Sequence, residues 1–249
     1  MTRRDSNAVA AARAALRAFA SQERAKGTAR YFKAGPGEYG EGDVFVGVSV
    51  PDVRKVARAH ADLTLDDLAT LLLSEIHEER LLALIVLVRR FERSKSAEAR
   101  RAIFELYMGH LDRVNNWDLV DTSAAPIVGA SLRGGDRREL DRLARSKHLW
   151  SRRVAMIATH HYIKDGDVDD ALRIATMLLG DRHDLIHKAV GWMLREVGER
   201  AGRDRLRAFL EQHAARMPRT ALRYAIEKLP DAERKRWLAV PRVSDASSA

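Results

Sequence analysis

Apolar residues recur every three or four positions along most of this chain, the spacing that places them on one face of a helix. Residues 7–25, which are rich in Ala and Arg, follow this pattern and are predicted to be helical. Pro51 suits the first turn of a helix that runs to about His60. Residues 34–47 hold five of the 15 glycines and are predicted to be irregular.

The helical pattern continues through the rest of the chain. Thr64 followed by Asp67 resembles a helix start ahead of residues 68–73, and short Gly, Asp or Ser breaks separate the later helical segments. Strand patterns are nearly absent, so we predict an all-α protein. The length suits one domain, which we place at residues 1–240, followed by a small, polar and disordered tail at 241–249.

Five of the predicted helices can be aligned with one another, which suggests an internal repeat. The aligned segments start at Leu81, Asp118, Arg153, Ala189 and Ala221, so the starts are 37, 35, 36 and 32 residues apart. A period of this length in an all-helical chain predicts stacked helical pairs, as in a superhelical solenoid of HEAT-like repeats. Identity between the units is poor, and an irregular helical bundle is the alternative.

The same alignment predicts a shared surface. The position before each start and the position three residues into it are neighbours on a helix. A stack of such helices would present one face, extended by Arg195, that carries Trp117, Asp121, Arg152, Lys188 and Trp192. Because a curved solenoid usually binds its partner on its concave side, we predict that this face is concave and basic.

Net charge narrows the class of partner. Lys and Arg number 44 against 35 Asp and Glu, which gives a formal net charge of +9 and a sequence pI near 10.1. A charge of this size favours a polyanion such as nucleic acid. The alternative is that the arginines form solvated faces without a specific partner.

Three absences narrow the class of protein further. The chain has no cysteine, which excludes disulfides, thiolate zinc sites and cysteine nucleophiles. Residues 1–4 lead into an Ala-rich helix without the apolar core of a signal peptide. No apolar run approaches the ~20 residues needed to cross a bilayer, and the longest, 81–88, stops at Arg89. We therefore expect a cytoplasmic protein that makes no membrane contact.

Trp117 and Asp121 form the most informative pair in the sequence. Four residues apart, they lie on one helical face, where an indole and a carboxylate together can hold a cationic or electron-poor group. Asn115 or Asn116 can cap this helix, and Asp118 suits its positive end.

Asp121 itself lies too far into the helix for a capping role, and its neighbours are mostly apolar. Pro126 removes the amide that would bond to Thr122, so we predict a kink just past Asp121. The carboxylate is therefore a candidate catalytic group, and a solvated surface aspartate is the alternative.

A second tryptophan is flanked by cations. Trp192 lies between Lys188 and Arg195 at helical spacing, a setting that suits phosphate contact combined with stacking on a base. A core position is the alternative. Trp150 and Trp237 have no such flanks, and we predict that they are packing residues.

Two motif matches, one to a dinucleotide-binding loop and one to a zinc site, lack the context that such sites need. Residues 35–40 fit the Gly-rich dinucleotide pattern, but they follow a helix rather than a strand, and nearby acidic residues would repel a pyrophosphate. His183 and His187 have the spacing of a helical zinc pair, but no third ligand is evident and Lys188 adds like charge. We expect no metal and no cofactor.

Five segments in order resemble the AlkD-like DNA alkylation repair glycosylases, a family built from HEAT-like helical repeats. The matching segments are residues 31–33 with the Gly-rich loop, 45–54, 116–121, 150–155 and 188–196. The resemblance implies excision of N3- or N7-alkylated purines from double-stranded DNA, without a metal, in base excision repair.

The resemblance also implies roles for single residues. Asp121 matches the family's catalytic aspartate, and Trp117 and Trp192 match the two tryptophans that contact the lesion-bearing nucleotide. Tyr31 matches a DNA-contacting tyrosine.

The basic residues of the matched segments imply a grip on the DNA backbone. Arg152 or Arg153 matches the arginine that holds it, and the repeat register favours Arg152. Lys188 and Arg195 would add phosphate contacts. We expect a monomer that associates with the nucleoid through DNA. The alternatives are a non-catalytic module that binds branched or distorted DNA, and a protein-interaction scaffold.

Overall fold

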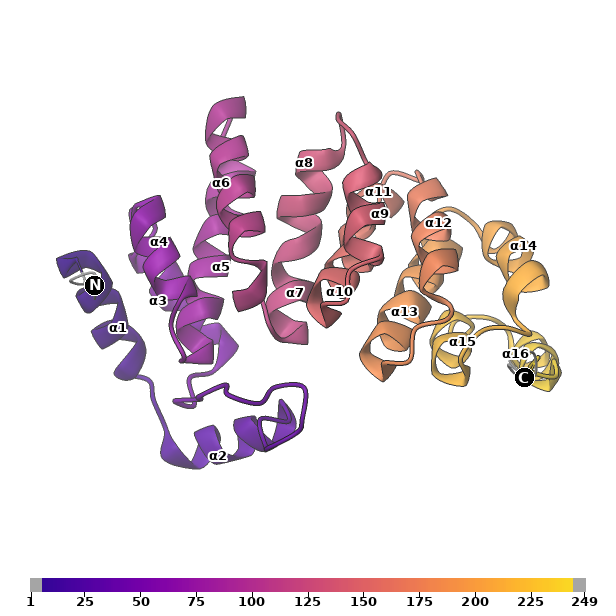
Figure 1. Ribbon diagram of the computed structural model, residues 1–249, viewed down its shortest axis with the longest axis horizontal. Coiled ribbons are helices and arrows are strands. Elements are labelled where there is room, and N and C mark those ends of the chain that lie inside the picture. Colours follow the sequence, from indigo (N-terminus) through magenta and orange to yellow (C-terminus); the bar gives the residue numbers. More distant parts are fainter. Residues whose placement is uncertain (1–5, 244–249) are drawn as a thin grey trace. The chain divides into compact units, whose positions relative to one another are not determined.

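The computed structural model describes residues 6–243, and their secondary structure is helical apart from an isolated parallel bridge between Val44 and Ile76 (Figure 1). The predicted all-α class is confirmed. Residues 1–4, where no signal peptide was expected, and residues 244–249 of the expected tail lie outside the described residues. No helix within 6–243 combines the length and apolarity that a bilayer span requires.

The chain divides into two compact units, Met1–Ile127 and Val128–Ala249. The single domain at residues 1–240 and the concave basic face therefore stay predictions.

The first unit is built around α5. Its helices are α1 (Asn7–Arg17), α2 (Gln22–Tyr31), α3 (Val50–Ala59), α4 (Leu65–Leu72), α5 (His77–Arg93), α6 (Ala97–Gly109), a 3-10 turn (Leu111–Arg113) and α7 (Trp117–Ser123). Helix α5 packs against α3, α4 and α7, and its residues from Leu81 to Leu87 are at most 3% exposed. The apolar run that the sequence shows is therefore the core of this unit.

The second unit repeats the arrangement around α13. Its helices are α8 (Ala130–Leu132), α9 (Arg138–Ala144), α10 (Leu149–Ala158), α11 (His160–Ile163), α12 (Asp169–Leu178), α13 (Asp184–Arg200), α14 (Arg203–His213), α15 (Arg219–Ala225) and α16 (Asp231–Ala239). Helix α13 packs against α10 and α15 and also against α12 and α14. Trp150 and Trp237 are 4% and 5% exposed, which confirms that they are packing residues.

The five aligned helices are α5 and α7 in the first unit and α10, α13 and α15 in the second. They pack against their repeat neighbours within each unit, α5 on α7 and α13 on both α10 and α15. Gly191 permits the last contact, because a Cβ there would lie 2.5 Å from the carbonyl oxygen of Ala221. The prediction of stacked helical pairs is confirmed within each unit.

Helix starts were mostly well predicted. Pro51 lies in the first turn of α3, which ends at a His60 cap, and Thr64 and Asp67 form a complete capping box at α4. The single helix expected over residues 7–25 was wrong. The chain turns after Arg17, and Ser21 caps a new helix while its amide donates to the carbonyl of Val46 at 3.0 Å.

Candidate functional site

Helix α7 carries Trp117 and Asp121 on one face, as the sequence predicted. Asn116 caps the helix, because its Oδ1 accepts from the Trp117 amide at 2.9 Å. Both side chains are half-buried and line the same cavity of about 510 Å³ in the first unit. The other charged residues in its wall are Arg54, Arg89, Glu92 and Asp118.

The helix changes geometry directly after this pair. Regular α-helix ends at Ser123 and a π-helical segment, Ala124–Gly129, follows and contains Pro126. Because proline has no amide to donate, the regular hydrogen-bond pattern cannot continue through this segment, and the kink expected just past Asp121 stays a prediction. Ser123 is fully buried, and its hydroxyl donates to the carbonyl of Leu119 at 2.6 Å.

The Trp117 indole is held in place by an aromatic cluster. The cluster consists of Trp117 itself and Tyr31, Phe32, Phe45 and His77. Phe32 stacks on Trp117 with ring centroids 5.1 Å apart, and it also stacks on Phe45 at 5.3 Å. Tyr31 meets Trp117 edge-on at 5.8 Å and is 66% exposed. The structure thus brings Tyr31 and Trp117 together and leaves the tyrosine accessible to a ligand.

A buried ion network beneath this cluster joins three segments of the chain. His77, in the first turn of α5, has Nε2 2.8 Å from an Asp118 oxygen on α7 and Nδ1 3.1 Å from an Asp43 oxygen in the Gly-rich loop. Arg80 donates to Asp43 at 2.5 Å, and the Asn116 amide group donates to it at 3.1 Å. The network fixes the start of α7, and so the direction of Trp117 and Asp121.

Burial and ion pairing act in opposite directions on the titrating groups of this network. Burial alone would lower the pKa of His77, but the charge and hydrogen bond of Asp118 and the hydrogen bond of Asp43 raise this pKa to about 9. Burial would raise the pKa of Asp43, but the hydrogen bond from His77 and the charge of Arg80 hold this pKa below its ordinary value. The network is therefore charged at neutral pH.

Glu78 anchors the end of the Gly-rich loop. Its carboxylate accepts from the amides of Val46, Gly47 and Val48 at 2.8–3.2 Å and is 3% exposed. Gly47 has φ +76°, and a Cβ there would lie 2.2 Å from the carbonyl oxygen of Ser21. Only glycine allows this approach without a shift of the backbone.

The Gly-rich loop has no dinucleotide-binding geometry. Its amides are engaged by its own acidic side chains: the carboxylate of Glu38 accepts from the Gly35 amide, and that of Glu41 from the Gly37 amide, both at 3.0 Å. These amides are therefore not available to a pyrophosphate, and the nearby carboxylates would repel it.

In the second unit, Trp192 lies on the accessible side of α13 and is half-buried. Its indole Nε1 donates to Glu196 at 3.1 Å, and the His160 ring lies 6.0 Å away. Arg200 donates to the same Glu196 carboxylate at 2.8 Å. The indole is thus oriented by a buried carboxylate rather than packed into the core.

The two cations that flank Trp192 are each engaged by a carboxylate. Lys188 pairs with Asp184 at 2.8 Å and its side chain is 41% exposed, while Arg195 pairs with Glu227 of α15. Both side chains keep accessible surface on the same helix as Trp192, so all three predicted residues of α13 share its partly exposed side.

Arg152 and Arg153 have different environments. Arg152 is half-buried, pairs with Asp181 at 2.6 Å and donates to the carbonyls of Ser146 and Lys147. Arg153 is 4% exposed and donates to the carbonyl of Leu185 at the start of α13. Of the two, Arg152 is the more exposed, with 19% of its side chain accessible, and Arg153 is built into the interior.

The six residues predicted for the shared face, Trp117, Asp121, Arg152, Lys188, Trp192 and Arg195, are all half-buried and so keep accessible surface. At the aligned positions that the prediction did not include in this face, Leu84 and Met156 are fully buried, and Arg80 is 1% exposed within the ion network. His183 accepts from the amide of Leu185, and His187 contacts the carbonyl of Asp181, so both histidines have local structural partners.

Sequence reasoning missed most of the supporting residues. The ion network was not foreseen, although four consecutive polar residues precede the apolar run of α5, and all four, His77, Glu78, Glu79 and Arg80, are at most 3% exposed. A polar start of that kind on a buried helix was the available sign. Phe32 and Phe45 gave no sign, because single aromatic residues in a loop region have no periodicity.

Comparison with known proteins places this architecture in a family. The family model described as DNA alkylation repair enzyme matches residues 12–229. A solved structure described as a predicted DNA alkylation repair enzyme from Enterococcus faecalis has the same fold, with a TM-score of 0.65 and 17% identity. The match covers 85% of this chain and 97% of that one. No curated protein matches in sequence. Since the family model spans most of the chain, the protein belongs to the DNA alkylation repair enzyme family.

Proposed function

We propose that this protein is a monofunctional DNA glycosylase that releases N3- or N7-alkylated purines from double-stranded DNA. The single observation that supports this most is the pairing of Asp121 with Trp117 in the wall of one open cavity. The wall also carries Arg54 and Arg89, which can contact phosphates, beside the carboxylates of Glu92 and Asp118.

The proposed reaction needs few catalytic groups from the protein. Alkylation at N7 or N3 makes the purine cationic, so it is already a good leaving group and needs no general acid. As the bond from C1′ to the base nitrogen breaks, its electrons neutralise the purine and positive charge moves to the deoxyribose. Water then adds to C1′ and loses a proton, which leaves an abasic site and the free base.

Asp121 is proposed to stabilise the developing positive charge and to orient the attacking water. A carboxylate about 4 Å from a unit charge contributes roughly 4 kcal/mol at an effective dielectric constant of ~20. This corresponds to about a thousandfold in rate. One carboxylate can suffice here, whereas glycosidases that act on neutral sugars use two.

Trp117 and Tyr31 are proposed to contact the damaged nucleotide. Their rings meet edge-on, and an electron-rich indole face attracts a cationic sugar or base more strongly than a neutral one. Stacking of Phe32 on Trp117 would keep the indole in place when DNA binds. The pair would therefore favour damaged over undamaged nucleotides.

In the second unit, the partly exposed side of α13 is proposed as a DNA contact. Trp192 would stack on or against the lesion-bearing nucleotide, and Lys188 and Arg195 would contact phosphates without regard to sequence. Arg152 is proposed as a further backbone contact because its side chain is partly exposed. Arg153 is proposed to support α13 from the interior.

The test is incubation with DNA treated with a methylating agent, with the free bases identified by chromatography. We expect release of 7-methylguanine or 3-methyladenine without strand cleavage. Binding to branched DNA without release of any base would favour the non-catalytic module instead. Negligible DNA affinity even at low salt would favour the protein-interaction scaffold.

A further inference from the structure

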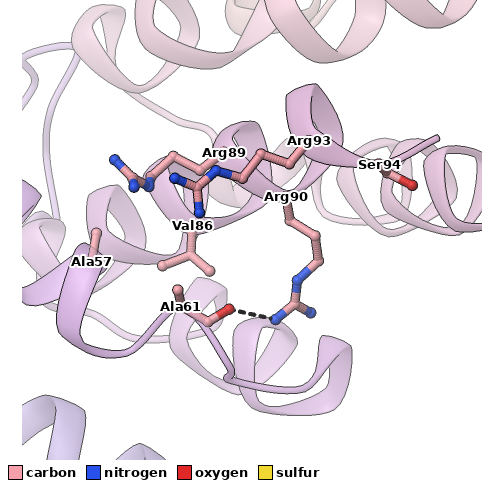
Figure 2. Close-up of a pocket in the computed structure, with 7 residues that line it drawn as sticks. All are labelled: Ala57, Ala61, Val86, Arg89, Arg90, Arg93 and Ser94. Carbon is pink, nitrogen blue, oxygen red and sulfur yellow. Dashed lines mark hydrogen bonds between the residues drawn. The ribbon is translucent and has the colours of Figure 1, made fainter.

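A second pocket in the first unit lies between α3 and α5 and is lined by arginines. It has a volume of about 340 Å³, and its wall contains Arg89, Arg90 and Arg93 from the last turns of α5 (Figure 2). Ala57, Ala61, Val86 and Ser94 complete the wall, so no carboxylate lines the pocket. Its lining is cationic side chains over a small apolar floor.

Arg89 and Arg93 point the same way across Val86, as Figure 2 shows. One helical turn apart, they are like charges at a spacing that destabilises a helix unless something compensates. Within residues 6–243, neither guanidinium has a carboxylate at ion-pair distance, and the buried Nε of Arg89 has no hydrogen-bond partner. By contrast, Arg80 and Arg101 of the same unit each pair with a carboxylate.

Arg90 has a different role from its two neighbours. It turns away from them and donates to the carbonyl of Ala61 (Figure 2), and it also donates to the carbonyl of Leu63, which holds the segment between α3 and α4 against α5. The two bonds explain Arg90, and the helix C-terminus favours a cation at Arg93 as well as at Arg90, because both lie in the last turn of α5. This does not explain why Arg89 and Arg93 both line an open pocket that has no carboxylate in its wall.

We propose that Arg89 and Arg93 bind one backbone phosphate of the DNA strand that carries the lesion. This rests on the proposed function. A phosphodiester supplies the negative charge that the two guanidinium groups lack, and arginine forks suit phosphate oxygens. The position follows from Arg89, because this residue also lines the cavity that contains Trp117 and Asp121. The bound phosphate therefore lies within a few nucleotides of the damaged base.

Binding measurements separate this proposal from the catalytic one, because they need no excision. The probe is a duplex with a single stable abasic analogue, titrated with the protein over a series of salt concentrations. Arg93→Gln should weaken binding about tenfold and lower the salt slope by about one unit. Arg101→Gln is the matched control. It removes the same charge from the 79% exposed Arg101 of α6 and should leave the slope nearly unchanged.

The position of the phosphate is tested by neutral linkages. Single methylphosphonates are placed, one at a time, at each position from three nucleotides before to three after the abasic analogue. The wild-type protein should lose affinity strongly when one particular linkage is neutral. Arg93→Gln and Arg89→Gln should each lose much less affinity at that same linkage, and each should respond to the other linkages as the wild-type protein does.

Three results would overturn the proposal. One is equal loss in Arg93→Gln and Arg101→Gln, which would show only a general charge effect. Another is an Arg93→Gln or Arg89→Gln variant that loses as much affinity as the wild-type protein at every neutral linkage. The third is that millimolar inorganic phosphate binds in the pocket while Arg93→Gln and the wild-type protein bind DNA equally well. That result would assign the pocket to a free anion. If base release fails while the linkage pattern holds, the catalytic proposal alone is wrong.

Discussion

Nε2 of His77 lies 2.8 Å from a carboxylate oxygen of Asp118, three residues before Asp121 on the same helix. The imidazole is 2% exposed and its other nitrogen faces Asp43, so it has a carboxylate on each side. A proton on this ring ties α5, α7 and the Gly-rich loop together. The candidate site therefore depends on a charge that lies outside it.

This contact predicts a pH dependence of stability. The folded pKa of His77 is raised to about 9 from an unfolded value near 6.5, so its contribution is complete below pH 6.5 and is lost as pH rises through 9. The loss is on the order of 3 kcal/mol. Chemical denaturation at pH 6 and pH 9 measures it.

The matched variant is His77→Gln, which removes the titrating ring and keeps a polar side chain. The variant should be less stable than the wild-type protein at pH 6 and should show a much smaller change between the two pH values. An equal pH dependence in both proteins would show that His77 does not carry the effect.

Gly47 predicts a steric effect on the loop that carries Asp43. Gly47→Ala should lower the free energy of unfolding by ~3 kcal/mol or more, because it adds overlap with the Ser21 carbonyl to an unfavourable φ. Gly42 also has a positive φ, +86°, but open space around it, so Gly42→Ala should cost only ~1 kcal/mol. Similar losses in urea denaturation would exclude the close approach as the cause.

Trp192 predicts a difference between catalysis and binding. If its indole contacts the damaged nucleotide, Trp192→Ala should reduce kcat/KM on methylated DNA by more than it reduces affinity for undamaged duplex. The measurement is single-turnover release of 7-methylguanine beside a binding titration. Equal reductions would make Trp192 a general DNA contact.

The sequence was informative where a regular pattern has one physical cause. Helical periodicity, the capping box at Thr64 and Asp67, and the proline that ends regular α7 all have local origins, and they predicted the corresponding elements. The break between α1 and α2 was missed because Ser21 is also held by Val46, a contact that no local pattern encodes.

The candidate site was predictable only in part for the same reason. Trp117 and Asp121 share a helix face, so their spacing alone was sufficient. Asp43, His77 and Asp118 come from three segments, and nothing in their spacing indicates that they meet. The exposure of Arg152 against Arg153 likewise depends on how α10 packs on α13, which a double arginine in a sequence leaves open.

The central claim is that the Asp121 carboxylate carries the chemistry. Asp121→Asn preserves shape and removes the charge, and Asp112→Asn, at an exposed aspartate of the neighbouring 3-10 turn, is the matched control.

The most direct measurement is single-turnover release of 7-methylguanine from methylated duplex DNA by these two variants and the wild-type protein, each shown to be folded by thermal denaturation. The account predicts a loss of about a thousandfold in Asp121→Asn alone, with DNA affinity nearly unchanged. Near-normal release by Asp121→Asn would contradict it.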